Sequence, residues 1–153
     1  MTPPPRITDA PIVPDGPDDW RKVVVGYDGS EAAKRALAHA GRLVGERTRV
    51  VVVAVAEPYP RSGITVPANR DPAEIRRRRG ELEDARAFLL TIGIEAETVQ
   101  ARGKPAEILV EASQDADLII VGGRKLNRVQ RLVLRSVTSA VVHDAACDVL
   151  VVR

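Results

Sequence analysis

Apolar runs and helical repeats alternate along the chain, and together they predict five strands and four helices. Short runs rich in valine, leucine and isoleucine are typical of strands buried on both faces of a parallel sheet. The expected strands cover residues 22–27, 49–56, 94–102, 118–121 and 149–152. Between them, apolar residues recur at helical spacing on segments that begin near Ser30, Pro72, Pro105 and Val137. Since strands and helices alternate, right-handed crossovers would give an open α/β fold, with a parallel five-stranded sheet covered by helices on both faces.

Two segments have neither the apolar runs of strands nor the repeat of a helix, and they are rich in proline or glycine. Residues 1–19 contain six of the eleven prolines in the chain. Proline lacks a backbone donor and this composition cannot bury much surface, so we predict a flexible N-terminal arm. Residues 57–71 are predicted to form a loop. The remaining length, 20–153, is typical of one domain.

The bulk composition argues against several classes of protein. A net charge of +2 over 153 residues is small for a dedicated nucleic-acid binder. The longest apolar run, 50–56, is far shorter than the roughly 20 residues that span a bilayer. Cys147 is the sole cysteine, which excludes an internal disulfide and fits a reducing compartment. We therefore expect a cytoplasmic protein that binds neither nucleic acid nor membrane.

A run of four arginines, 76–79, lies on the segment predicted as the second helix. Such a run could contact nucleic acid, but Glu81, Glu83 and Asp84 follow closely enough to pair with it. Local pairing favours a solvated, charged face of the helix over a binding site.

Common catalytic signatures are missing from the sequence. Neither Gly-x-x-x-x-Gly-Lys-Ser/Thr nor Gly-x-Gly-x-x-Gly occurs. His39 and His143 have neither metal-ligand spacing nor a nucleophile elbow nearby. We expect a protein that is not an enzyme, in which Asp28 could at most assist a slow, incidental hydrolysis.

Polar and glycine residues follow two predicted strands at their carboxyl ends. The first strand ends at Asp28-Gly29-Ser30, and the strand at Leu118 ends at Gly122-Gly123. If the strand order reverses between them, both ends stand at the topological switch point, where open α/β sheets bind ligands. There Asp28 could accept hydrogen bonds from a ribose or hold a metal-bound water, and the glycines would let phosphates approach the backbone. The alternative for Asp28 is a helix cap without a ligand.

Separated blocks of the sequence resemble the universal stress protein domain, and they occur in the same order. They are Val-Val-Val-Gly-Tyr-Asp-Gly-Ser-Glu at 23–31, Gly-Lys-Pro-Ala-Glu-Ile at 103–108, Asp-Leu-Ile-Ile-Val-Gly at 117–122, and the segment 136–152. The resemblance covers Lys22 to Arg153. It implies an open, Rossmann-like α/β fold with strand order 3-2-1-4-5 and a homodimer paired through the final strand, Val149 to Val152. An apolar edge strand suits that role, because an unpaired edge recruits another strand.

ATP-binding members of this family carry Gly-x-x-Gly, nine further residues, and then Gly-Ser/Thr. On this chain the first glycine matches Gly122 and the hydroxyl matches Ser136 with the same spacing. Lys125 and Arg135 stand at the other two glycine positions. The framework of the motif is therefore present, and two of its three glycines are replaced by cations.

The same resemblance places Asp28 at the acidic contact of the family and Val55 where the adenine is held. The candidate cofactor-binding residues are Asp28, Val55, Gly122, Gly123, Arg124, Lys125, Arg135, Ser136 and Val137.

Two hypotheses about these residues remain open. In the first, the crevice binds ATP or another adenine nucleotide, Lys125 and Arg135 clamp the phosphates, and Mg²⁺ is expected only together with the nucleotide. A non-glycine residue at positive φ costs about 1–2 kcal/mol, whereas a charge-assisted hydrogen bond from Lys125 or Arg135 to a phosphate returns about 1.5–3 kcal/mol. Because these energies are comparable, they do not decide whether the altered motif binds a nucleotide. In the second, the crevice is empty or blocked, and the basic segment 124–135 binds an unidentified acidic protein partner.

Overall fold

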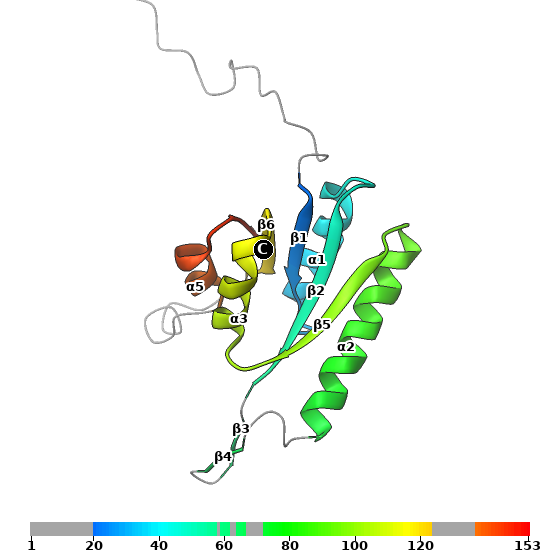
Figure 1. Cartoon of the computed structure of the whole chain (residues 1–153). Helices are drawn as coiled ribbons and strands as arrows, with labels where there is room; N and C mark the ends of the chain where they lie inside the picture. Colours follow the sequence, from blue (N-terminus) through cyan, green and yellow to red (C-terminus); the bar gives the residue numbers. More distant parts are fainter. Residues whose placement is uncertain (1–19, 58, 62–63, 67–71, 124–136) are drawn as a thin grey trace, which may run out of the picture.

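A sheet of five parallel strands forms the centre of the protein, in the order β5-β2-β1-β6-β7 (Figure 1). The computed structural model describes residues 20–57, 59–61, 64–66, 72–123 and 137–153. The arm predicted for 1–19 and the basic segment 124–135 lie outside this described part. The strands of the sheet are β1 (Lys22–Gly26), β2 (Arg49–Ala56), β5 (Ala96–Arg102), β6 (Leu118–Gly122) and β7 (Asp148–Val152).

The predicted fold class and strand order are confirmed. Counted along the chain within this sheet, the observed order is 3-2-1-4-5. β1 occupies the middle and pairs in parallel with β2 on one side and β6 on the other. Its residues Val23, Val24 and Val25 are at most 1% exposed, which agrees with an apolar run that has no polar face.

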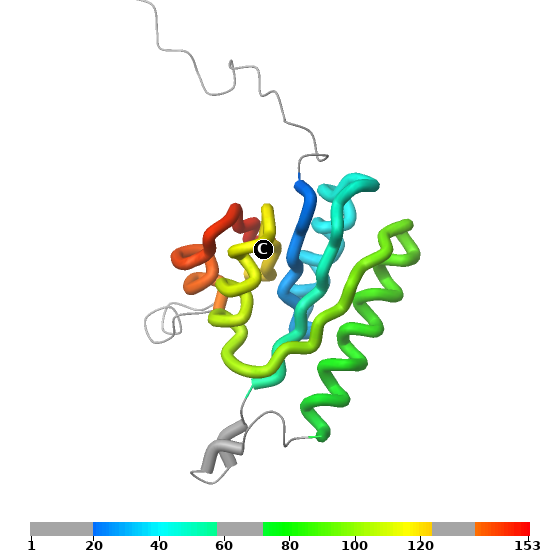
Figure 2. The backbone as a smooth tube through the Cα atoms, in the orientation of Figure 1, coloured from blue at the N-terminus to red at the C-terminus, as the bar shows by residue number. Residues whose placement is uncertain are grey.

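Two pairs of helices cover the two faces of the sheet, so the fold has three layers (Figure 2). Val23 and Val25 face the cluster formed with the first pair, and Val24 faces the cluster formed with the second. This alternation follows from the pleat of the strand. The first pair is α1 (Glu31–Leu43) and α2 (Pro72–Thr91), and the second is α3 (Pro105–Ala112) and α5 (Val137–Asp144).

Part of the predicted loop at 57–71 is a two-stranded antiparallel hairpin instead. Its strands are β3 (Tyr59–Arg61) and β4 (Ile64–Val66). The prolines and glycine of the segment indicated a loop, but tyrosine, isoleucine, threonine and valine favour strands. Proline is tolerated in a strand that lies at an edge, so Pro60 can pair opposite Thr65.

Two side chains fix β6 and the helices around it to the rest of the domain. The carboxylate of Asp117, just before β6, accepts hydrogen bonds from the amides of Arg21 and Lys22, each at 2.8 Å. The hydroxyl of Ser113, which is 1% exposed, donates to the carbonyl of Val110 and accepts from the amide of Ala146. These contacts hold β1 beside β6 at one end and α3 against the turn before β7.

Candidate functional site

The carboxyl ends of β1 and β6 lie next to each other, and the chain leaves them in opposite directions. Val25 is paired with Ile120, so Tyr27 and Gly122 follow at the same level of the sheet. After β1 the chain continues to β2 on one side, and after β6 it continues to β7 on the other. This is the topological switch point of the sheet, where ligands bind in open α/β folds.

The segment between β1 and α1 is a tight turn that presents an exposed carboxylate. The Oδ1 atom of Asp28 accepts a hydrogen bond from the amide of Ser30 at 3.0 Å. Gly29 has a φ of +75°, a conformation that favours glycine. The Oγ atom of Ser30 accepts from the amide of Ala33 at 3.2 Å and caps α1. The helix cap is therefore Ser30, and Asp28 orders the turn that precedes it.

Gly122 is packed against the first turn of α1. A Cβ atom at position 122 would lie 2.4 Å from the carbonyl carbon of Ala32 and 2.7 Å from the nitrogen of Ala33. Close packing against the helix is by itself a sufficient reason for glycine at this position, and the predicted role in phosphate access stays a prediction. Gly123 donates from its amide to the carbonyl of Val152 at 2.7 Å, which extends the pairing of β6 with β7.

The remaining candidate residues lie partly inside and partly outside the described part of the chain. Val55 lies near the carboxyl end of β2, is 7% exposed and belongs to the apolar cluster on the α3 and α5 face. Val137 begins α5 and is 37% exposed. The candidates outside the described residues are Arg124, Lys125, Arg135 and Ser136.

Sequence reasoning missed a residue that holds α5 to the switch point. The Oγ1 atom of Thr138 donates a hydrogen bond to the carbonyl oxygen of Gly122 at 3.1 Å. This bond joins the first turn of α5 to the end of β6, so the amino termini of both α1 and α5 lie against Gly122. The only sequence signal was the position of Thr138 two residues after Ser136, at the predicted start of that helix.

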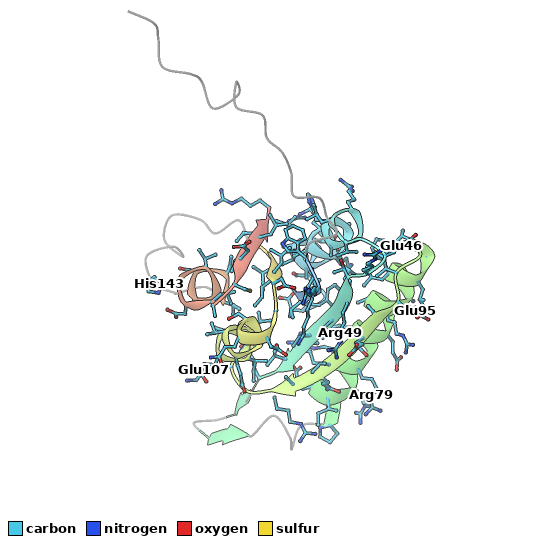
Figure 3. The ribbon with its side chains drawn as sticks, turned by 45° about the horizontal axis from the view of Figure 1, so that its top comes forward. Glu46, Arg49, Arg79, Glu95, Glu107 and His143 are labelled. Atoms are coloured by element: carbon cyan, nitrogen blue, oxygen red, sulfur yellow. The ribbon has the colours of Figure 1, made fainter. Side chains whose placement is uncertain are left out.

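The prediction of a solvated arginine face on α2 is wrong for one of its four residues. Arg78 is 8% exposed and lies on the same stripe of the helix as Leu82, Ala85 and Leu89, which are also buried. Arg79, the next residue, points away from the body of the protein (Figure 3). The helical period of 3.6 residues extends the apolar stripe to position 78, and this signal was available in the sequence.

The guanidinium of Arg78 contacts both α2 and the turn after β1. Its Nε atom lies 2.9 Å from Glu74, and its Nη1 atom lies 2.9 Å from Glu81. Nη1 also donates to the carbonyl oxygen of Asp28 at 3.4 Å. Burial alone would lower the pKa of Arg78, but hydrogen bonds and the negative charge of Glu81 and Glu74 raise it above the ordinary arginine value. Arg78 is therefore a fixed positive charge beside the switch point.

Tyr27 lies near this charged cluster and is 7% exposed. Burial raises the pKa of its phenol above the ordinary value; Lys34 opposes the shift, and nearby carboxylates add to it. The phenol is thus protonated and uncharged at neutral pH. Within the described residues, no group of three or more histidine, cysteine or acidic side chains is placed to hold a metal ion. No helix in the same part of the chain is long and apolar enough to cross a membrane.

Comparison with known proteins identifies the family. A sequence model of the Universal stress protein family matches residues 19–153. The chain belongs to the universal stress protein family. A curated relative from Thermus aquaticus, the universal stress protein in the QAH/OAS sulfhydrylase 3' region, is 35% identical over 137 residues, which are 88% of this chain and 99% of the relative. The resemblance in the separated sequence blocks is therefore confirmed.

Solved structures of universal stress proteins have the same fold as this family member. A universal stress protein in complex with cAMP matches with a TM-score of 0.71 at 24% identity, covering 89% of this chain and 99% of that one. The Archaeoglobus fulgidus universal stress protein in complex with dAMP matches with a TM-score of 0.61 at 24% identity, covering 86% and 97%. These likenesses show the fold of the chain.

Proposed function

We propose that this universal stress protein is a stress-response module that binds an adenine nucleotide at the switch point between β1 and β6. The observation that carries the proposal is the meeting of an exposed carboxylate, at Asp28, with two helix amino termini packed on Gly122. A carboxylate suits ribose hydroxyls, and helix amino termini suit phosphates. Two solved relatives of the same fold carry cAMP and dAMP, which supports the same class of ligand here.

Five of the nine candidate residues have proposed contacts with the nucleotide in this site. The carboxylate of Asp28 accepts hydrogen bonds from the ribose, and Val55 contributes apolar contact to the adenine. The phosphates lie toward the amino terminus of α5, where Ser136, Lys125 and Arg135 are expected to contact them. ATP is the proposed nucleotide because two cations replace glycines in the phosphate motif, and Mg²⁺ would enter only with it.

The proposal includes no catalytic step. The protein is proposed to act in the cytoplasm as a binding module, supported by its single cysteine, Cys147, and by the lack of a recognisable nucleophile and base in the sequence. Slow loss of the terminal phosphate from bound ATP would be incidental to this role.

Asp28→Ala is expected to weaken nucleotide binding by about tenfold to a hundredfold, because it removes charge-assisted hydrogen bonds to the ribose. Calorimetry with ATP, AMP and cAMP measures the dissociation constants. For the wild type, ligand at about 100 times its dissociation constant should add about 2.7 kcal/mol to the free energy of unfolding.

The matched control is Asp115→Ala, which removes the same charge at the opposite, amino-terminal end of the strands. Asp115 pairs with Lys22 at the start of β1, so its loss should leave nucleotide affinity unchanged. Failure of the wild type to bind any of the three nucleotides at millimolar concentration would contradict the proposal. The hypothesis of an interaction module that binds an acidic partner would then take its place.

The same proposal includes a homodimer paired through β7. This strand ends the order of the main sheet, so one of its edges has no neighbour within that sheet. Val149, Leu150 and Val151 are half-buried there, and an apolar edge of this kind favours addition of a strand from a second copy.

Light scattering is expected to give a mass of twice 16.5 kDa for the wild type. Val149→Glu should shift the protein to monomer, because it places a charge in the proposed interface. Val142→Glu introduces the same charge on the exposed face of α5, where the valine is 55% exposed, and should leave the dimer intact. A wild type that has the mass of one chain at every concentration would exclude the dimer.

A further inference from the structure

Arg78 links α2 to the turn that carries Asp28, although the two lie 50 residues apart in the chain. The side chain of Arg78 is 10% exposed, and those of its partners Glu74 and Glu81 are 16% and 19% exposed. An arginine this far from solvent keeps its charge, so its remaining donors need acceptors. The carbonyl oxygen of Asp28 is one of these acceptors, and this contact holds the peptide group between Asp28 and Gly29.

The partner Glu81 also closes over the same turn. A Cβ atom on Gly29 would lie 2.9 Å from the Oε1 atom of Glu81, so the carboxylate packs directly on the glycine. The turn therefore lies between the capped start of α1 and an ion-pair cluster on α2. Its conformation depends on both helices, whereas the hydrogen bond from Ser30 to Asp28 orders it only locally.

Arg77 provides an internal comparison, because it pairs with the same two carboxylates. Its Nη2 atom lies 2.8 Å from Glu74 and its Nε atom 4.0 Å from Glu81, but its side chain is 60% exposed. The contact with the turn after β1 comes from Arg78. If these arginines only stabilise α2 through ion pairs, replacing either one should have a similar effect. If Arg78 also holds the turn, only its replacement should affect the turn.

We propose that Arg78 is a positioning residue, which holds the β1–α1 turn so that the Asp28 carboxylate is presented to the ligand at the switch point. This inference rests on the proposed function. A turn that is already ordered loses less conformational entropy when ligand binds. Loss of the guanidinium does not remove the Asp28 carboxylate, but it allows the turn to sample other conformations. The affinity for the nucleotide therefore falls.

The experiment compares Arg78→Met, Arg78→Lys and the control Arg77→Met. Arg78→Met retains an apolar stem for packing and removes the guanidinium. It should raise the dissociation constant for AMP by about three- to tenfold, the effect of releasing one or two ordered groups. Arg78→Lys keeps the positive charge between Glu74 and Glu81 and should recover part of that affinity. Arg77→Met should leave the dissociation constant unchanged.

Amide hydrogen exchange of the ligand-free protein separates loop ordering from general loss of stability. Arg78→Met should speed exchange at the amides of Ser30 and Ala33, while the amide of Val24 in the centre of β1 keeps its wild-type protection. Faster exchange at all three amides would mean that the whole domain has lost stability, and would overturn a positioning role. Equal effects of Arg77→Met and Arg78→Met, or no effect of Arg78→Met on either measurement, would overturn it as well.

The two proposals fail in different ways. If the wild type binds no adenine nucleotide, the proposed function is wrong, and the inference that Arg78 presents Asp28 to that ligand falls with it. If the wild type binds and Arg78→Met binds equally well with unchanged exchange at Ser30 and Ala33, the proposed function stands and the role of Arg78 is rejected.

Discussion

Gly122→Ala is expected to lower the free energy of unfolding by about 2–3 kcal/mol, the upper part of the range for overpacking. The new Cβ atom would lie 2.4 Å from the carbonyl carbon and 2.6 Å from the carbonyl oxygen of Ala32. These are backbone atoms of α1, which cannot rotate aside as the end of a side chain could. The first turn of the helix must therefore move away from β6. Urea denaturation measures the loss directly.

Gly80→Ala is the matched control for this prediction. Gly80 lies within α2, and a Cβ atom there would meet nothing within 4 Å. Alanine at an open helical position should stabilise the protein by about 0.5–1 kcal/mol, because glycine is a poor helix former. A Gly122→Ala protein as stable as the wild type would contradict the close approach of α1 to β6. Since the same approach places the helix amino terminus at the switch point, nucleotide binding should weaken in parallel.

Leu89→Ala is expected to cost about 3–4 kcal/mol of unfolding free energy, which is within the range for a leucine replaced in a packed core. Leu89 is 0% exposed and joins α2 to the cluster beneath the sheet. The stripe that holds α2 in place has few large apolar side chains, and Leu89 is the last of them along the helix. Its removal leaves a cavity that the small neighbour Ala85 cannot fill.

The adjacent residue gives the control. Leu90 is 49% exposed, so Leu90→Ala removes the same atoms from the same helix at little cost, within about 0.5 kcal/mol. Calorimetric melting of both variants gives the comparison. Equal losses in the two variants would mean that helix propensity, and not the packing of α2 on the sheet, determines the stability of this region.

The strands could be predicted because their composition carries the signal without help from the rest of the fold. β2 runs from Arg49 to Ala56, as predicted, and residues 50–56 of this strand are all valine or alanine. β5 begins at Ala96, two residues after the predicted start at residue 94, because the backbone of Ile94 is bonded to α2. The amide of Ile94 donates to the carbonyl of Leu89 at 2.9 Å, so this residue completes the end of α2. Such backbone hydrogen bonds cannot be predicted from the pattern of hydrophobic residues.

The candidate site was harder to predict because its geometry depends on contacts between distant segments. The strand order brings the ends of β1 and β6 together, and the order followed from the resemblance to a family. The packing of Gly122 on Ala32 and the burial of Arg78 beside Asp28 depend on how helices seat on the sheet. A glycine that serves a helix and one that serves a phosphate look alike in a sequence. The inward-facing arginine of the run of four was different, because Arg78 continues the helical stripe of Leu82, Ala85 and Leu89 and could have been found from the sequence.

The central position of β1 has a consequence for synthesis of the protein on the ribosome. β1 is made first among the strands, yet one of its two neighbours, β6, follows much later; Lys22 and Asp117 are separated by 95 positions. Translation at about 5–20 residues per second spans that interval in about 5–20 seconds. For that time the nascent chain holds β1, whose three valines are buried in the folded protein, with one side unpaired. A ligand at the switch point cannot assist folding at this stage, because β6, which forms one side of the switch point, has not yet been translated.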